Sequence, residues 1–422
     1  MSAAYYLGKR GVSSMLIEKR PRLGGVIQTE RIDACLVEGG PDSFLSSKPW
    51  AMALIRELGL EHEVIGSNDH LRKTFIRKQG RMIPLPAVEV ASVITTPLLS
   101  WTTKAKIARE YFRRPATTPR PDCSVAEFIT DHYGQEVVDY VAEPLLAGVY
   151  GGTPETLSVA SVAPKFVELE SKYGSLSKGI LAERKPSTEP TFRTLKNGLG
   201  SLVEALQTKA NVVHGEVETI ERTPGGYRLR VSGDWLDAER VALACESHAS
   251  AALLRAVDPV LAQELSKIPY TSSTVIAMAF EPQSLEGFGF LVPRKERRRI
   301  VACTFMGTKF PFRVPENRFL VRCFVSDTGD DSGVLEELRD LTGLRGDPVF
   351  IRSYPWPQSM AQYLVGHGAT ISRIQDRLSN ISGLYLTGNA YYGVGIPDCI
   401  RGARQLAEKV TPSGNGPSNA KY

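Results

Sequence analysis

Residues 1–20 read MSAAYYLGKRGVSSMLIEKR, and this stretch decides the fold class of the chain. Residues 1–12 predict a short helix that ends near Gly11, and Met15-Leu16-Ile17 predicts a buried strand that ends on Glu18. A helix that leads into a strand closed by an acid is typical of the second half of a dinucleotide-binding βαβ unit. In that unit the acid binds a ribose hydroxyl. We therefore expect a Rossmann-like α/β domain and assign Glu18 to the ribose.

The first half of such a unit does not precede the helix in the printed sequence. That half is a strand and the turn G-x-G-x-x-G, whose backbone N–H groups hold the pyrophosphate. The strand is central in its sheet, so its loss would leave buried backbone groups unpaired at about 1–3 kcal/mol each. We therefore expect translation to begin further upstream, with Met1 as an internal codon. The alternative is an inactive truncated remnant.

A glycine pair directly after Glu18 supports a dinucleotide cofactor. Residues 19–26 read KRPRLGGV. Gly24 and Gly25 let the backbone approach a phosphate closely, and Arg22 can neutralise that phosphate.

The C-terminal region carries a second glycine-rich signal. Residues 384–386 predict a short strand, and Gly388 to Gly395 form a glycine-rich loop. Pro397 and Asp398 predict the first turn of a helix that runs to about Val410. The N–H groups and the positive dipole end of such a helix suit an anion or an electron-rich ring edge. Together with residues 1–26, this loop favours a dinucleotide cofactor over ordinary αβ turns.

Composition excludes several other classes. The chain has 422 residues, 42% hydrophobic and 23% charged, with a net charge of +5. This charge is too mild and dispersed for nucleic-acid binding. The six cysteines and six histidines lack metal-ligand spacing, so we predict no metal site and reduced thiols. No run has the apolar length of a transmembrane helix, and the N-terminus does not have the charge order of a signal peptide. We therefore predict a cytoplasmic protein.

Several stretches resemble one family of flavoenzymes. The sequence is similar to the FAD-dependent protoporphyrinogen and coproporphyrinogen oxidases, which are amine-oxidase-like flavoenzymes. The stretches that carry the resemblance are EKRPRLGGVIQT (18–29), VEGGPDSFL (37–45), EPLLAGVYGGTPETLS (143–158), LKNGLGSL (195–202), GFGFLVP (287–293), QYLVGH (362–367) and TGNAYYGVGIPDCI (387–400). The resemblance covers almost the whole chain in order, except for the missing N-terminal strand and glycine-rich loop.

The resemblance implies a set of residues that bind FAD. Glu18, Arg22, Gly24 and Gly25 belong to the dinucleotide signals above, and the resemblance adds Val26. Residues 40–43 would line the isoalloxazine ring, and Val217 would contact the adenine through its backbone. The backbone of residues 388–389 and 394–396 would approach the ring. By name, these further residues are Gly40, Pro41, Asp42, Ser43, Val217, Gly388, Asn389, Val394, Gly395 and Ile396.

The resemblance also implies a reaction. A flavin accepts a hydride, and the protein mainly orients the donor carbon, so we predict no catalytic acid–base set. The product porphyrin has lost six electrons, so the flavin would cycle three times, with O2 as acceptor and hydrogen peroxide as product. Handover of the porphyrin to the next heme-pathway enzyme would follow. The substrate is an apolar macrocycle with carboxylate arms, and we assign Gly148 and Val149 to its slot. The alternative is that Gly148 only turns the chain.

Two other function classes remain open at this point. One is a different flavoenzyme, an amine oxidase or a carotenoid desaturase. Amine oxidases usually place aromatic rings around the flavin, and Tyr391-Tyr392 keeps this possibility open. The other is the inactive remnant, which a flavin absorbance spectrum would separate from both enzymes. The sequence does not separate protoporphyrinogen IX from coproporphyrinogen III.

The predicted organisation is discontinuous. An FAD-binding domain takes residues 1–45, 192–265 and 375–422, and its last residues, 411–422, are a polar tail that we predict to be disordered. A substrate domain with a mixed sheet takes 46–86 and 266–374. A helical domain takes 87–191.

One segment of the helical domain has the composition of a membrane interface. Residues 87–102 are largely apolar, and residues 103–114 are rich in Lys and Arg. An apolar stretch with Trp101 beside a basic helix suits the surface of an anionic bilayer. The alternative is a helical hairpin that packs on its own domain, with a solvated basic face.

Overall fold

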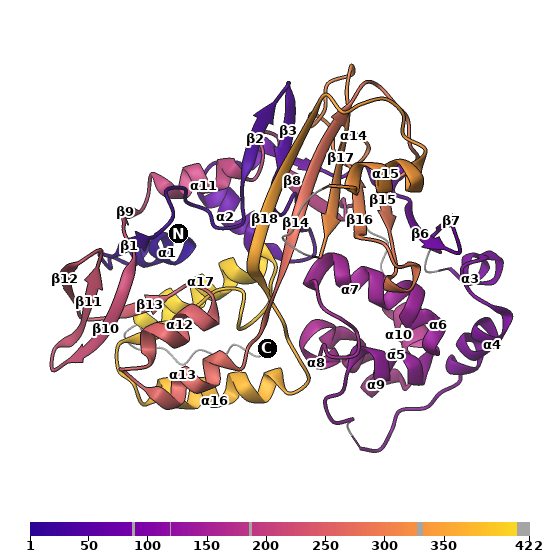
Figure 1. Cartoon of the computed structure of the whole chain (residues 1–422). Coiled ribbons are helices and arrows are strands. Elements are labelled where there is room, and N and C mark those ends of the chain that lie inside the picture. Colours follow the sequence, from indigo (N-terminus) through magenta and orange to yellow (C-terminus); the bar gives the residue numbers. More distant parts are fainter. Residues whose placement is uncertain (87–88, 119, 185–187, 327–331, 412–422) are drawn as a thin grey trace.

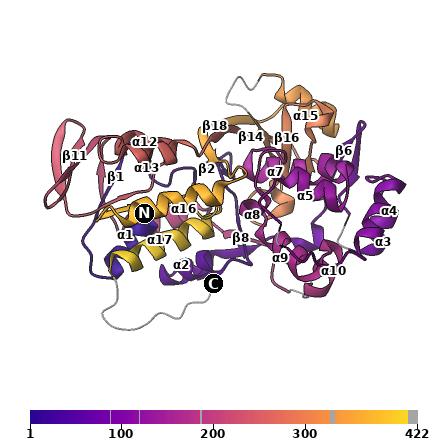
Figure 2. The same cartoon turned by 90° about the horizontal axis from the view of Figure 1, so that it is seen from below.

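A large mixed sheet stands in the middle of the molecule. The computed structural model describes the chain except for residues 87–88, 119, 185–187, 327–331 and 412–422. Nearly all of the predicted C-terminal tail therefore lies outside the described residues. Figures 1 and 2 show the sheet between a nucleotide-type α/β region at one end and a group of short helices at the other.

The central sheet has seven strands and contains one parallel pair. β15 and β6 run parallel, and the other neighbours run antiparallel. In sheet order the strands are β18 (Phe350–Ala361), β14 (Tyr270–Phe280), β17 (Phe319–Val325), β16 (Ile300–Phe305), β15 (Gly289–Leu291), β6 (Thr74–Lys78) and β7 (Arg81–Pro84). The strands of 266–374 that the sequence predicts are confirmed in β14 and β17. Helix α14 (Met306–Lys309) follows β16 and contacts β16 and β17, and helix α15 (Val334–Thr342) contacts β16.

The nucleotide-type region contains two short parallel pairs. β1 (Met15–Glu18) pairs with β9 (Asn211–His214), and β13 (Val241–Leu243) pairs with β19 (Leu384–Leu386). Within the described residues the two pairs are separate sheets. The prediction that residues 15–17 are buried is wrong, because Met15 is 43% exposed and the rest of β1 is half-buried. The physical reason is that β1 pairs with a strand on one side only among the residues that the structure describes.

Helices pack around these parallel pairs in two groups. The first group shares a core that includes Leu7, Leu54, Leu206 and Leu406. Its members are α1 (Ser2–Lys9), α2 (Pro49–Glu57), α11 (Gly200–Gln207) and α17 (Ile396–Val410). The second group packs against β13 and β19, and consists of α12 (Ser247–Leu254), α13 (Pro259–Ser266) and α16 (His367–Ser379). The predicted helices at residues 1–12 and 397–410 are thus confirmed.

Residues 89–184 are mainly helical, as predicted. Serine N-caps explain several helix starts, because Ser100, Ser124, Ser158 and Ser175 each accept a hydrogen bond from the N–H three residues later. The helices are α3 (Val90–Thr95), α4 (Trp101–Glu110), α5 (Val125–His132), α6 (Gln135–Val137), α7 (Glu143–Tyr150), α8 (Val159–Val162), α9 (Pro164–Tyr173) and α10 (Leu176–Glu183). Among the described residues, no helix is long and apolar enough to cross a membrane.

Three small antiparallel sheets complete the fold. β2 (Thr29–Ile32) pairs with β3 (Cys35–Glu38), and β10 (Val217–Thr223), β11 (Gly226–Val231) and β12 (Asp234–Ala238) form a meander. The third sheet has the order β4 (Phe44–Leu45), β8 (Phe192–Leu195), β5 (Val64–Gly66). This last sheet ties the segment after β3 to the segment that follows the helical region. It therefore helps to position residues 39–45 between the three parts of the molecule.

Candidate functional site

The carboxyl ends of the parallel strands meet at one place. Glu18 ends β1, Cys245 lies two residues after β13, and Gly388 lies two residues after β19. A Cβ placed on Gly388 would lie 3.5 Å from the carbonyl oxygen of Ala244. Burial raises the pKa of the Cys245 thiol, and the charge of Glu18 contributes to that shift, so Glu18 lies within electrostatic reach. Ligands of open α/β sheets bind at such carboxyl ends.

The loop after β1 is shaped by its own arginine. The guanidinium of Arg22 donates hydrogen bonds to the carbonyl oxygens of Leu23, Gly25 and Ile27. Any phosphate contact of Arg22 would therefore use its remaining N–H groups. The carboxylate of Glu18 accepts one hydrogen bond from the N–H of Arg20, at 2.9 Å.

The two glycines of this loop have different roles. Gly24 has a φ of +95°, and a Cβ there would lie 2.8 Å from the side chain of Val203 in α11. Gly25 has a φ of +60°, and a Cβ there would meet nothing within 4 Å. Gly24 is thus required for packing, whereas Gly25 borders open space where a ligand could approach the backbone. Val26 is 38% exposed.

Residues 39–43 form a loop that is held tightly against the central sheet. A Cβ on Gly40 would lie 1.9 Å from the carbonyl oxygen of Val26, and one on Gly39 would lie 2.5 Å from the Tyr354 ring. The indole N–H of Trp356 donates to the carbonyl oxygen of Gly39 at 2.8 Å. Side chains at Gly39 and Gly40 would push this loop away from β18 and from residue 26. The predicted glycines therefore serve close backbone packing.

Asp42 is buried in this loop together with two cations. Its carboxylate lies 2.8 Å from Nζ of Lys309 in α14 and 3.1 Å from Nη1 of Arg322 in β17. The hydroxyl of Ser43 donates to the same carboxylate at 2.6 Å, and Arg322 also donates to the carbonyl oxygen of Gly40. Burial acts to raise the pKa of Asp42, but the charges of Lys309 and Arg322 outweigh it and hold the pKa well below its usual range.

The C-terminal glycine-rich loop is positioned by two tyrosines. The hydroxyl of Tyr363 donates to the carbonyl oxygen of Asn389 and accepts from the N–H of Gly393, each at 2.7 Å. Asn389 donates from its side chain to the carbonyl oxygen of Ser359 at 3.0 Å, and the hydroxyl of Tyr270 lies 3.5 Å from its side-chain oxygen. The loop is thus held by groups at the ends of β14 and β18.

The start of α17 already contains a carboxylate. Asp398 is 4% exposed and lies in the first turn, 2.5 Å from Nζ of Lys48. A Cβ on Gly393 would lie 2.6 Å from the Asp398 carboxyl carbon, and one on Gly395 would lie 3.1 Å from its oxygen. Val394 and Ile396 are half-buried beside it. Because the Asp398 carboxylate already occupies the N-terminal end of α17, the surface available to a ligand is the backbone of residues 388–396.

The predicted substrate residues lie on an exposed helix face. Gly148 and Val149 belong to α7, and Val149 is 57% exposed. Leu145 is 41% exposed and lies one turn earlier on the same face. A Cβ on Gly148 would lie 3.8 Å from the side chain of Leu291 in β15. Gly148 is within the helix, so it does not turn the chain, and it lies where α7 meets β15 of the central sheet.

Val217, which the resemblance assigns to the adenine, lies apart from the residues assigned to the isoalloxazine ring. It begins β10, directly after the loop that follows β9, and it is half-buried. Since β9 is the neighbour of β1, this position is at the side of Glu18 and not at the side of residues 39–43. That placement agrees with the adenine role that the resemblance implies.

Sequence reasoning missed several residues that hold this site: Lys48, Lys309, Arg322, Trp356 and Tyr363. One signal was available, because Arg322 interrupts the apolar strand FLVRCFV with a charge. A charge inside a buried strand indicates a buried partner. No pattern in the sequence pairs it with Asp42, which is 280 residues away.

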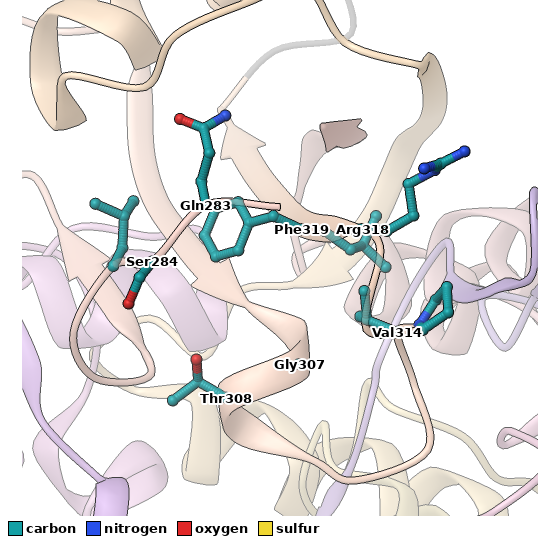
Figure 3. Close-up of a pocket in the computed structure, with 10 residues that line it drawn as sticks. Gln283, Ser284, Gly307, Thr308, Val314, Arg318 and Phe319 are labelled. Carbon is teal, nitrogen blue, oxygen red and sulfur yellow. The ribbon is translucent and has the colours of Figure 1, made fainter. Parts of the chain in front are cut away.

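Two other features lie outside this site. A hollow of about 210 Å3 lies between the β14–β15 loop and residues 307–320. Figure 3 shows Ser284 and Thr308 among the residues that line it. None of the predicted site residues lines it. In the helical region Asp131, His132 and Glu170 are close together, but Arg120 pairs with both carboxylates, which makes this group an ion-pair network.

Comparison with known proteins places the chain. The family model described as flavin-containing amine oxidoreductase matches residues 1–411. The chain belongs to this family. A relative from Bacillus subtilis (strain 168), named coproporphyrinogen III oxidase, is 32% identical over 97% of this chain and 96% of its own length. Protoporphyrinogen oxidase 1, chloroplastic, from Arabidopsis thaliana is 27% identical over 94% of this chain and 82% of its own length.

Solved structures agree with the fold of this flavin oxidoreductase. A crystal structure from Exiguobacterium sp. 255-15, of a candidate protoporphyrinogen oxidase, superposes with a TM-score of 0.87 at 29% identity, over 97% of this chain and 95% of that one. UDP-galactopyranose mutase has a TM-score of 0.72 at 16% identity, over 97% and 92% of the two chains, which shows a shared fold. The predicted fold class and the flavin cofactor are confirmed.

The residues present suit a flavin. Gly25 and Gly388 expose backbone at the carboxyl ends of the parallel strands, and both have positive φ values, +60° and +121°. The loop of residues 39–43 contacts the middle of β18 through Trp356, and the loop of 388–396 contacts the C-terminal end of the same strand through Ser359 and Tyr363. A long, flat ligand could extend from Glu18 to these two loops. The positive charge beside Gly40 suits an electron-rich ring.

Proposed function

We propose that this flavoenzyme uses FAD to oxidise a porphyrinogen to the porphyrin. The observation that carries the proposal is the match, along nearly the whole chain, to relatives named coproporphyrinogen III oxidase and protoporphyrinogen oxidase. Three relatives with the first name are 28–32% identical to this chain, and three plant protoporphyrinogen oxidases are 25–27% identical, which favours coproporphyrinogen III as substrate. The alternative activity, that of an amine oxidase, has less support. Of the two tyrosines that left it open, Tyr391 is buried and Tyr392 is 41% exposed.

The proposal gives each part of the site a role. A bound flavin supplies the acceptor for a hydride. Glu18 would hold the ribose of FAD, and the backbone of Gly25 would contact the phosphates. Residues 40–43 and 388–396 would hold the ring between them, and the exposed apolar face of α7 would contact the macrocycle. We also keep the division into an FAD-binding, a substrate and a helical domain as part of the proposal.

A porphyrin-fluorescence assay with purified chain and FAD tests the activity. Fluorescence should rise with coproporphyrinogen III and more slowly with protoporphyrinogen IX, and O2 should be consumed with release of hydrogen peroxide. A yellow protein that oxidises neither porphyrinogen but does oxidise amines would overturn the proposal. Handover of the porphyrin to the next heme-pathway enzyme is a further expectation, which a coupled assay of the two enzymes would measure.

A carboxylate variant tests the cofactor site separately. Glu18→Gln should weaken FAD binding by about 1.5–3 kcal/mol, the range for a hydrogen bond to a charged group. The matched control is Glu216→Gln, because Glu216 lies close to the same strand pair, where it is exposed and paired with Lys19. Flavin retention on dilution is the measurement. Equal retention in both variants would remove Glu18 from the site.

We further propose that α3 and α4 contact an anionic membrane surface from the cytoplasmic side. Trp101 and Phe112 are 74% and 79% exposed, and Arg109 and Arg114 are also exposed. Exposed aromatic rings beside free cations suit a lipid interface better than a packed hairpin. Lys104 is less free, because it lies 4.5 Å from the Trp101 ring centre and donates to a carbonyl oxygen of α3.

Vesicle binding tests this contact. Removing a charge such as Arg109 should weaken binding to vesicles with anionic lipid by about 1 kcal/mol at low salt. Trp101→Ala should weaken binding further, whereas Trp235→Ala should not. Trp235 is 51% exposed on β12, at the opposite end of the molecule (Figure 1). If wild-type chain does not bind these vesicles at low salt, the helices only pack on their own domain.

A further inference from the structure

The buried group at Asp42 carries more positive than negative charge. Lys309 and Arg322 both form ion pairs with Asp42, and within the described residues no other carboxylate pairs with either cation. The side chains are 12%, 1% and 11% exposed for Lys309, Arg322 and Asp42. The group therefore holds a net charge of one positive unit out of water. An uncompensated buried charge is costly, so its retention calls for a compensating ligand.

Arg322 has hydrogen-bonding capacity that the described chain does not use. Its Nε is buried and has no hydrogen-bond partner among the described residues. Its other nitrogens reach the Asp42 carboxylate and the carbonyl oxygen of Gly40, so the guanidinium lies directly against the loop of residues 39–43. Phe324 packs against it, with the guanidinium carbon 5.2 Å from the ring centre. These contacts fix the position of the charge.

Lys309 is likewise held in place by polar contacts and aromatic rings. Its ammonium lies 2.9 Å and 2.8 Å from the two Asp42 oxygens and 3.4 Å from the Ser43 hydroxyl. It also lies over the rings of Phe192 and Phe310, at 5.0 Å and 5.3 Å from their centres. The backbone of α14 is tied to β5 and its following turn, because the N–H of Asn68 donates to the carbonyl oxygen of Lys309.

We propose that Lys309 and Arg322 form a fixed cationic site under residues 39–43 that stabilises the negative charge of the reduced flavin, with Asp42 holding both cations in place. Hydride transfer brings two electrons and one proton to the ring, so the ring gains one negative charge. The substrate loses the hydride from carbon and then one proton to solvent. The inference rests on the proposed function, in which residues 40–43 line the ring. Lys309 and Arg322 thus act on the flavin through their charge, and Asp42 is the positioning residue that acts through them.

The reduction potential of the bound flavin is the test. In the FAD-loaded chain, Lys309→Met and Arg322→Met should each lower the affinity for reduced relative to oxidised flavin about tenfold, which is about 30 mV for a two-electron couple. Lys309→Arg should keep the potential of the wild type. Lys309→Met is the main variant, because Asp42 then keeps Arg322 as its partner and the fold is retained.

The matched control is Arg352→Met. Arg322 and Arg352 are both paired in register with Ala277, one on each side of β14. Arg352 is 54% exposed and already paired with Glu30, so its removal should leave the potential unchanged. An equal shift in Arg352→Met would indicate a long-range charge effect and would overturn the inference, as would an unchanged potential in both Lys309→Met and Arg322→Met.

Lumiflavin, the ring without ribose or phosphate, separates this inference from the proposed function. Its binding does not depend on the ribose and phosphate contacts. The wild-type chain should bind reduced lumiflavin more tightly than oxidised lumiflavin, and Lys309→Met should lose most of that preference. If the chain does not bind FAD but still prefers reduced over oxidised lumiflavin, the result counts against the proposed cofactor site alone. No binding of reduced lumiflavin, or the same preference in the variant, would overturn the cationic site.

Discussion

Two buried ionic groups lie four residues apart on the same segment and differ in charge balance. Glu38 pairs with Arg313 at 3.3 Å, and both side chains are 0% exposed. Asp42 pairs with two cations. In both groups the Nε of the arginine is buried without a partner among the described residues, so hydrogen-bond satisfaction does not distinguish them. The net charge distinguishes them, because the Glu38 group is neutral and the Asp42 group has one positive charge in excess.

The surroundings of the two groups follow this difference. Glu38 also accepts hydrogen bonds from the Thr29 hydroxyl at 2.6 Å and from the N–H of Leu199 at 2.8 Å. Arg313 donates to the Thr194 hydroxyl and the carbonyl oxygen of Leu195. The pair thus cross-links β2, β3, β8 and the start of α11. The Asp42 group instead lies against the loop that we assign to the flavin. A neutral pair suits a structural cross-link, and an unbalanced group suits a site that receives an anion.

The largest expected effect is on the structural pair. Arg313→Met leaves Glu38 buried without its cation, which should cost about 3–5 kcal/mol in free energy of unfolding. Urea unfolding measures this loss. The double variant Glu38→Leu/Arg313→Met should recover part of it, because no charge is then left unpaired. A single variant that loses less than about 1 kcal/mol would show that the pair is not a cross-link.

The same variant has an expected pH dependence. Burial raises the pKa of Glu38, and Arg313 opposes this rise. Without Arg313 the folded-state pKa should rise further, so the folded state binds more protons than the unfolded state above pH about 4. The loss of stability in Arg313→Met should therefore grow as pH rises from about 4 to 8. A loss that shrinks with rising pH would contradict the assignment.

The next effect is on the unbalanced group. Asp42→Asn leaves Lys309 and Arg322 without a carboxylate but keeps an oxygen that accepts from both, so the expected loss is about 3 kcal/mol, the lower end of the range for breaking a buried ion pair. Since the pKa of Asp42 is held below its usual range, its stabilising contribution is present above the unfolded-state pKa of about 3.9 and is lost as pH falls below it. Unfolding measured between pH 3 and 7 should show this acid-side loss in the wild type and a smaller one in the variant.

The sequence predicted the outline of both groups but not their partners. The parallel strands, the central strands and the helix at 397–410 follow from local patterns, so they were predictable from residues near one another. Glu38 and Asp42 lie in a stretch whose resemblance pointed to the flavin, yet their partners come from β17, α14 and residue 313. Pairs that are more than 260 residues apart are set by the docking of the sheet on this segment. No periodicity encodes that docking.

The burial of β1 shows the same limit in another way. Its apolar residues predict burial, but burial depends on what lies on each side of a strand, and β1 has β9 on one side only. The two glycines of the loop after β1 show the same limit. Gly24 and Gly25 are equivalent in the sequence, and only the position of Val203 in α11 shows that Gly24 is packed and that Gly25 borders open space.

A smaller effect is expected for Lys309→Met. Asp42 keeps Arg322 and the Ser43 hydroxyl, and the variant removes an excess charge, so the net change in free energy of unfolding should be within about 1 kcal/mol. Urea unfolding of the flavin-free chain measures it. A loss as large as that of Arg313→Met would mean that Lys309 is a structural partner of Asp42 and that the two groups do not differ in kind.

The smallest effect is expected where a similar contact is exposed to water. Lys48 pairs with Asp398 at 2.5 Å, and this pair ties the segment after β4 to the start of α17. The side chain of Lys48 is 39% exposed, so solvent screens the pair, and Asp398 also keeps Arg401 at 3.4 Å and the positive end of the helix. Lys48→Met should therefore lower the free energy of unfolding by about 0.2–1 kcal/mol, and less at high salt. Unfolding at low and high ionic strength is the measurement. The prediction would be contradicted by a loss above about 2 kcal/mol that does not change with salt. Removing a cation would then be costly even at an exposed position. Burial and excess charge would in that case not explain the difference between the groups at Glu38 and Asp42.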